Sequence, residues 1–267
     1  MVIDTHCHLD CTEFDPDRAA VLVRTRAAGV VGLVIPAIRR AGWPGLLALC
    51  ATNADLHPAL GLHPVYLDQH RDADIPALER AIADARPLAV GEIGLDYFVR
   101  DLDRHRQQAL FEAQLEIARA ADLPVLLHVR KAHEQVLAAL KRIPVRGGIA
   151  HAFSGGSEEA RRYLDLGFAL GFGGMLTFER SHRLRALAAA LPIEAIVLET
   201  DAPDLTVAAH RGERNSPEYL QDVLAALAQV RGEPPAGLAA KTTANAQTVL
   251  GLSVPQPDTL PEKARHD

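Results

Sequence analysis

The sequence predicts an α/β fold, a (β/α)8 barrel of the TIM type, and three observations lead to this prediction. Eight short apolar runs alternate with longer segments of helical periodicity from one end of the chain to the other. The length of 267 residues suits one large α/β domain with a substantial core. No Gly-x-Gly-x-x-Gly motif follows the first apolar run, which argues against an open dinucleotide-binding sheet.

The predicted strands are short and rich in apolar residues. They cover Val2–His6, Val30–Pro36, Pro58–Leu62, Leu88–Ile93, Pro124–His128, Gly148–His151, Phe168–Gly171 and Ala195–Glu199. The helices expected between and after them cover Asp17–Ala28, Arg40–Asn53, Ile75–Ala85, Arg104–Ala121, Lys131–Arg142, Ser157–Leu166, Ser181–Leu191, Pro217–Arg231 and Pro235–Leu250. Because no Ser/Gly linker or charge run divides them, we expect a single barrel domain over residues 1–252. The polar, Pro-containing tail over residues 253–267 is predicted to be disordered.

Composition narrows the class of protein and its surroundings. The net charge of −6 provides no globally basic surface, so any attraction for nucleic acid must come from a local site. Cys7, Cys11 and Cys50 form neither an even disulfide set nor a Cys-x-x-Cys pair, which indicates a reducing compartment. The sequence shows neither a basic leader nor an apolar run of membrane length. We therefore expect a cytoplasmic protein without membrane association, a monomer or weak dimer with no stable protein partner.

The first predicted strand runs directly into a His-x-His motif. In an extended strand successive side chains alternate between faces, so His6 and His8 would point the same way and Cys7 the other way. Two imidazoles on one face can hold a single metal ion. Cys7 is then expected to be a buried structural thiol. Asp4, on the face of the two histidines, is a candidate to orient an imidazole.

Further polar side chains stand at the ends of other predicted strands. In a (β/α)8 barrel these ends meet at one rim, where the active site lies. The candidate ligands gathered there are His6, His8, Glu92, His128, His151 and Asp201. Imidazoles and carboxylates without a thiolate suit Zn²⁺, Mn²⁺ or Mg²⁺. Six ligands exceed the needs of one tetrahedral ion, so we expect two ions, with Glu92 placed to bridge them.

Five motifs together resemble one family over nearly the whole chain, from Val2 to about Leu250. They are Asp4-Thr5-His6-Cys7-His8, Gly61-Leu62-His63-Pro64, Gly91-Glu92-Ile93-Gly94-Leu95-Asp96-Tyr97, His151-Ala152-Phe153-Ser154-Gly155 and Glu199-Thr200-Asp201-Ala202-Pro203. In order and spacing they resemble the TatD-like metal-dependent hydrolases, deoxyribonuclease-type members of the amidohydrolase superfamily. Gly171-Phe172-Gly173-Gly174 and Glu199-Thr200-Asp201-Ala202-Pro203-Asp204 look closest to a YjjV-like branch.

The resemblance implies a division of the ligands between two divalent ions. His6, His8 and Asp201 would hold one ion, and His128 and His151 the other, with Glu92 bridging. It also implies a metal-activated water as nucleophile and Asp201 as the group that takes its proton, so Asp201 and Glu92 are the predicted catalytic residues. Two departures affect the expected substrate pocket. Val129 replaces the usual Ser after His128, and Ala152 replaces the usual Cys after His151.

The expected reaction is hydrolysis of a phosphodiester at the end of a DNA or RNA strand. Arg130 is a candidate phosphate clamp or a rim salt bridge, and His63 is a candidate substrate contact. The same kind of site can hydrolyse a small amide, lactone or phosphate ester, although Glu92 stands where many such enzymes carry a carbamylated Lys. A non-enzymatic metal-loaded barrel is the third alternative.

Overall fold

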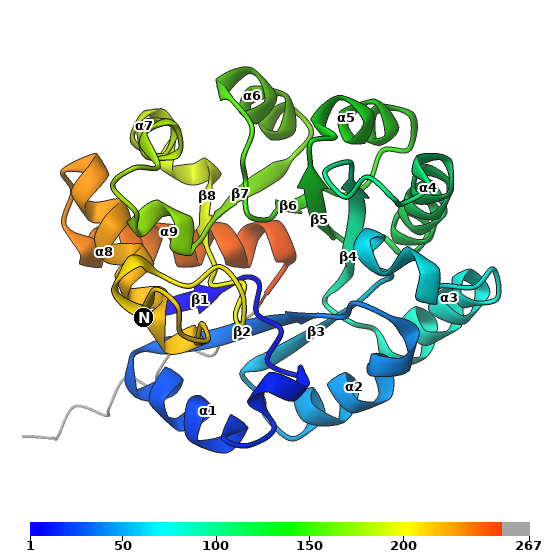
Figure 1. Cartoon of the computed structure of the whole chain (residues 1–267), viewed down its shortest axis with the longest axis horizontal. Helices are drawn as coiled ribbons and strands as arrows, with labels where there is room; N and C mark the ends of the chain where they lie inside the picture. Colours follow the sequence, from blue (N-terminus) through cyan, green and yellow to red (C-terminus); the bar gives the residue numbers. More distant parts are fainter. Residues whose placement is uncertain (253–267) are drawn as a thin grey trace, which may run out of the picture.

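The computed structural model describes residues 1–252, and the predicted disordered tail lies outside the described residues. Eight parallel strands follow one another in sequence order around the molecule. Figure 1 shows them as a central ring with helices outside it, so the predicted (β/α)8 barrel is confirmed. The strands are β1 (Val2–Asp4), β2 (Val30–Pro36), β3 (Leu56–Leu60), β4 (Ala89–Asp96), β5 (Val125–Arg130), β6 (Gly148–Ala150), β7 (Phe168–Phe172) and β8 (Ile196–Leu198).

The helices lie close to the predicted segments. They are α1 (Arg18–Ala27), α2 (Trp43–Ala51), α3 (Asp74–Ala85), α4 (Arg104–Ala121), α5 (His133–Arg142), α6 (Ser157–Asp165), α7 (His182–Ala190), α8 (Leu220–Arg231) and α9 (Pro235–Leu250). Local chemistry sets several of their ends. The Asp103 carboxylate accepts hydrogen bonds from the first backbone N–H groups of α4, and Gly232 ends α8 at a φ of 64°. Two predicted helices begin as 3-10 turns, Arg40–Gly42 before α2 and Pro217–Tyr219 before α8.

The strand ends differ from the prediction in a way that shapes the site. β1 stops at Asp4 and β8 at Leu198, so His6, His8 and Asp201 lie in the loops that follow these strands. The reason is that the backbone beyond β1 pairs with the backbone beyond β8. Asp201 N donates to His6 O at 2.8 Å, and His8 N donates to Ala202 O at 2.7 Å. In contrast, β4 and β5 run on to Asp96 and Arg130, which places Glu92 and His128 within strands.

The first and last strands close the ring through individual hydrogen bonds. Thr5 N donates to Leu198 O at 3.0 Å. The buried Asp4 carboxylate accepts from Thr200 N at 3.0 Å and from Thr200 Oγ1 at 2.6 Å. Asp4 also accepts from His6 N at 3.2 Å. The expectation that Asp4 orients an imidazole is therefore wrong, because its carboxylate is engaged with backbone and hydroxyl groups that join β1 to β8.

The barrel interior is filled by one aliphatic side chain from every strand and two from the last helix. These residues are Ile3, Val34, Ala59, Ala89, Leu126, Ile149, Ala169, Val197, Ala246 and Leu250. Figure 1 shows α9 lying across one end of the ring, where Ala246 and Leu250 seal the interior. Polar ligands are thereby confined to the opposite end. A second apolar layer fills the space between the strands and the outer helices. None of the helices in the described part of the chain is long and apolar enough to cross a membrane.

Candidate metal centre

Glu92 lies at the centre of the polar cluster at the open end of the barrel. Its side chain is 1% exposed, and its two carboxylate oxygens face different histidines. Oε2 lies 3.0 Å from His6 Nε2 and 3.3 Å from His8 Nε2. Both histidines follow β1, and although they lie beyond its end, both Nε2 atoms still turn toward Glu92. The loop geometry thus produces the common orientation that an extended strand would have given.

The other oxygen of Glu92 faces three further histidines. Oε1 lies 2.9 Å from His128 Nδ1, 2.9 Å from His151 Nε2 and 3.1 Å from His63 Nε2. His63 Nε2 is also 3.1 Å from His128 Nδ1. Sequence reasoning placed His63 among the substrate contacts, whereas the structure places it inside the cluster, 7% exposed. In the sequence, His63 stands in a turn and is not part of a His-x-His motif, so nothing there indicated that it joins the predicted metal ligands.

Asp201 completes the side of the cluster that holds His6 and His8. Its Oδ1 lies 3.7 Å from His6 Nε2 and 3.6 Å from His8 Nε2. Its backbone adopts a φ of +58°, a sparsely populated region for a residue with a side chain. The hydrogen bond from Asp201 N to His6 O holds this conformation. Glu92 Oε2, His6, His8 and Asp201 therefore form one half of the cluster.

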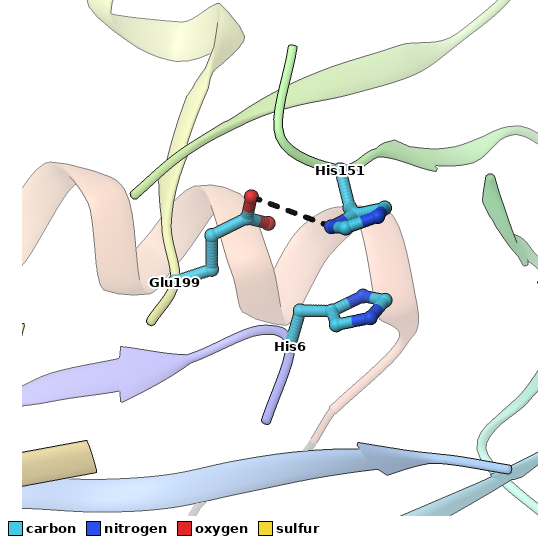
Figure 2. A group of neighbouring side chains, drawn as sticks. All are labelled: His6, His151 and Glu199. Carbon is cyan, nitrogen blue, oxygen red and sulfur yellow. Dashed lines mark ion pairs between the residues drawn. The ribbon is translucent and has the colours of Figure 1, made fainter. Parts of the chain in front are cut away.

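Glu199 lies beside the stacked rings of His6 and His151 (Figure 2). It is near Nδ1 of His151, whereas Glu92 faces the Nε2 atoms of both histidines. The two rings are 3.9 Å apart at an interplanar angle of 14°. Glu199 Oε1 accepts a hydrogen bond from Ala152 N and lies 3.7 Å from His151 Nδ1. Glu199 Oε2, His6 Nδ1 and His151 Nδ1 are buried and have no hydrogen-bond partner among the described residues. Glu199 therefore supports His151 on its Nδ1 side.

His128 has a supporting carboxylate to which sequence reasoning gave no role. Its Nε2 lies 3.0 Å from Asp96 Oδ2 at the end of β4. Asp96 Oδ1 accepts from the backbone N–H groups of Phe98 at 2.8 Å and Val99 at 3.1 Å. The pairing of Asp96 with Arg130 in the β4–β5 register brings this carboxylate beside His128. The signal available in the sequence was the position of Asp96 four residues after Glu92, on the same face of the strand.

Burial and mutual charge set the ionisation of the cluster. Burial raises the pKa of Asp201 to about 6 and lowers the pKa of His63 to about 4. Burial alone would lower the pKa of His8, but Glu92 and Asp201 outweigh it and raise this pKa to about 9. Burial alone would raise the pKa of Glu92, but the surrounding histidines hold it well below its usual range. Glu92 therefore stays ionised among the histidines, and together with Asp201 it favours the protonated form of His8.

The donor set fits divalent metal ions. Three groups of three residues bring their nitrogen and oxygen atoms within 4.8 Å of one another. They are His6–His8–Glu92, His63–Glu92–His128 and His6–His151–Glu199. Imidazole nitrogens with carboxylate oxygens are the ligands of Zn²⁺ and Mn²⁺. Cys7 is fully buried and its Sγ lies 3.8 Å from Ala202 O, so this thiol faces away from the cluster, as predicted.

Arg130 lies outside the cluster. Its guanidinium stacks on the Phe98 ring, 3.8 Å from the ring centroid, and it forms no ion pair with any residue in the described part of the chain. Among residues 1–252, Arg130 thus contacts an aromatic ring and forms no salt bridge at the rim. Phe98 is a large apolar side chain that remains 53% exposed. The pair stands at the rim, with Phe98 in the loop after β4 and Arg130 at the end of β5.

Comparison with known proteins agrees with this arrangement. The chain matches the family described as TatD related DNase over residues 3–251. It is 40% identical to the uncharacterized metal-dependent hydrolase YjjV of Escherichia coli K12, covering 94% of this chain and 98% of that protein. It is 34% identical to the 3'-5' ssDNA/RNA exonuclease TatD of Klebsiella pneumoniae, covering 95% and 99%.

Solved structures show the same likeness. The crystal structure of YJJV, a TatD homolog from Escherichia coli K12, superposes with a TM-score of 0.91 at 39% identity, covering 94% of this chain and 98% of that one. An organophosphorus hydrolase from Deinococcus radiodurans has a TM-score of 0.60 at 15% identity, covering 93% and 92%, and shows a shared fold only. Family match, relatives and cluster geometry all agree, and the chain therefore belongs to the TatD family of metal-dependent hydrolases.

Proposed function

We propose that this metal-dependent hydrolase cleaves phosphodiester bonds at the ends of DNA or RNA strands and uses two divalent ions, Zn²⁺, Mn²⁺ or Mg²⁺. The observation that carries the proposal is the division of the cluster by Glu92. One of its oxygens faces His6 and His8, and the other faces His128 and His151. A carboxylate whose oxygens serve two histidine sets is suited to bridge two ions.

In this proposal, His6, His8 and Asp201 hold one ion, His128 and His151 hold the other, and Glu92 bridges them. When bound, the ions supply Lewis acidity and make a water molecule acidic enough to attack phosphorus. Asp201 accepts the proton that this water loses, and its backbone hydrogen bond to His6 O fixes its position. A water oxygen–phosphorus bond would form and the phosphorus–oxygen bond to the leaving strand would break. That oxygen would take up the proton held by Asp201, which returns this carboxylate to its ionised form.

Three further residues support a phosphodiester substrate. His63 lies beside Glu92 Oε1 and His128, where its imidazole is placed to contact a phosphoryl oxygen. Arg130 presents an exposed guanidinium without a carboxylate partner among the described residues, and it stands two residues after His128. The exposed ring of Phe98 beneath it offers a surface for a base. A cation and an aromatic ring side by side match the alternation of phosphates and bases in a single strand.

The test is a metal-dependent nuclease assay with purified protein. Metal-free protein is reloaded with Zn²⁺, Mn²⁺ or Mg²⁺ and given end-labelled single-stranded DNA, RNA and a chromogenic phosphodiester. We expect turnover that requires metal and disappears in Glu92→Ala, while the exposed matched variant Glu79→Ala keeps wild-type rates. Turnover of small esters or amides without turnover of any phosphodiester would replace this proposal with the small-substrate alternative.

A second experiment tests the strand-binding role of the rim pair. Phe98→Ala and Arg130→Gln should raise KM for an oligonucleotide by about tenfold, since base stacking and one charged hydrogen bond each contribute about 1–3 kcal/mol. Both variants should leave KM for the chromogenic phosphodiester within twofold of wild type. Equal losses on both substrates would show that the pair acts on the metal centre and not on the strand.

A further inference from the structure

A cavity of about 1,110 Å³ opens beside the metal centre. It lies between the loop after β6, the segment after β7 and helix α7, and Glu199 and Asp201 form part of its lining. We propose that this cavity holds the terminal nucleoside of the strand during cleavage. This inference rests on the proposed phosphodiesterase function and deepens it by naming the group that the enzyme holds at the strand end.

The size and surface of the cavity fit such a group. Cavities that enclose small ligands measure roughly 300–1,000 Å³, so a cavity of about 1,110 Å³ is large enough for a nucleoside. Phe153 and Phe172 contribute to one part of its lining, and Leu184 and Leu187 of α7 contribute to another. A planar base with an apolar face is complementary to a lining of aromatic and aliphatic side chains.

Two large apolar side chains at the cavity are left exposed to solvent. Met175 is 40% exposed and Leu205 is 41% exposed, and both line the cavity. Leu205 has a φ of +50° and follows Asp201 by four residues. A bulky residue in the left-handed region costs conformational energy and marks a candidate functional position. An occupant with an apolar face would cover both side chains, which the described residues leave uncovered.

Two positively charged side chains at the cavity favour an occupant that is joined to a negatively charged group. Arg180 and Arg183 line the cavity, are exposed, and form no ion pair within residues 1–252. Unpaired cations beside an apolar lining complement a molecule that combines an apolar planar part with phosphate groups. A nucleoside joined to a phosphate chain has this combination. A neutral amide or lactone would leave both arginines unused.

The position of Asp201 links the cavity to the chemistry. Asp201 lines the cavity and also lies 3.6 Å from His8 Nε2 in the metal centre. A group inside the cavity is therefore directly next to the bond under attack. Phe98 follows β4 and Arg130 ends β5, whereas the cavity follows β6 and β7. The geometry provides one place for the strand and another for its last nucleoside, with the metal centre between them.

The experiment compares two tryptophan substitutions on the same helix. Ala186 is exposed and lines the cavity, so Ala186→Trp places an indole in the part of the cavity beside α7 without replacing a core residue. Ala189 is exposed on α7 outside the lining, so Ala189→Trp is the matched control. Each metal-loaded protein is titrated calorimetrically with deoxyadenosine 5′-monophosphate and with inorganic phosphate, after circular dichroism has shown that both variants are folded.

In wild type and Ala189→Trp, the nucleotide should bind at least tenfold more tightly than inorganic phosphate. In Ala186→Trp the ratio should fall to about one while phosphate still binds, because phosphate needs only the metal centre. Equal affinity for both ligands in wild type, or an unchanged ratio in Ala186→Trp, would overturn the inference. Strand cleavage is measured separately in wild type, so failure of the proposed function would appear as absent turnover and not as a changed affinity ratio.

Discussion

A substitution at Gly171 tests how tightly Glu199, the carboxylate beside His6 and His151, is packed. This residue lies in β7, opposite Val197 of β8. A Cβ added to it would lie 2.1 Å from Glu199 Oε2, 2.6 Å from Glu199 Cδ and 2.8 Å from Glu199 Oε1. Glu199 is fully buried and bonded to the backbone of Ala152. Because the added methyl group would overlap this carboxylate, Gly171→Ala must displace the Glu199 side chain, and with it the hydrogen bond from Ala152 N, or must shift the strand.

The expected cost follows from this overlap. Inserting a methyl group into a packed core costs about 1–3 kcal/mol, which for a protein of this size lowers Tm by about 2–12 °C. Gly45 of α2 is the matched control, because a Cβ there would meet nothing within 4 Å. Gly45→Ala should stabilise the protein by about 0.5–1 kcal/mol through the entropy of the unfolded chain. The two Gly→Ala changes therefore differ in sign.

The measurement is urea unfolding at equilibrium with chelator present, so that metal binding does not enter the result. A double-mutant cycle with Glu199→Ala then identifies the cause. In that background the methyl of Gly171→Ala occupies the space left by the carboxylate, and its cost should disappear. A cost that persists without Glu199, or a Gly171→Ala variant as stable as Gly45→Ala, would refute the proposed overlap.

Three other outcomes are expected. Leu250→Ala opens a void where α9 seals the barrel and should destabilise the protein by about 2–5 kcal/mol, measured by urea unfolding. Arg26 holds the pKa of Asp55 below its usual range, so Asp55→Asn should lower the free energy of unfolding by up to about 1 kcal/mol at pH 6. This difference should shrink as pH falls below about 4, because the wild-type carboxylate then also becomes neutral. A difference that does not change with pH would contradict this. Removing the metal with a chelator should abolish hydrolysis and lower Tm. Adding metal back at 100 times its Kd should raise the free energy of unfolding by about 2.7 kcal/mol, which corresponds to about 5–11 °C in Tm. An unchanged Tm would argue against a metal centre in the folded protein.

Much of the fold could be predicted because its signals are local. Each strand and helix carries its own apolar periodicity, and the rule that barrel strands end at a common rim connects distant residues. His6, Glu92 and Asp201 are separated by long stretches of sequence, yet the structure brings them together around Glu92. Where β1 ends was not predictable, because it depends on backbone hydrogen bonds that join His6 and His8 to Asp201 and Ala202, which are about 195 residues away in the sequence.

The remaining features depend on contacts between distant segments. Asp96 supports His128 only because of the β4–β5 register, and Arg130 stacks on Phe98 only because the end of β5 meets the loop after β4. His63 enters the cluster through the path of the chain after β3. The cavity arises from the relative placement of α7 and the loops after β6 and β7. No spacing or composition in one segment encodes such placements.

The closure of the ring has a consequence for synthesis of the protein on the ribosome. His6 and Asp201 are 195 positions apart, so at about 5–20 residues per second roughly 10–40 s pass between them. During that interval the nascent chain presents His6, Cys7 and His8 together, a sequence that binds soft metal ions readily. Folding then buries the Cys7 thiol and raises its pKa well above the usual value. The finished barrel thus excludes from its metal centre a sulfur ligand that the emerging chain still offers.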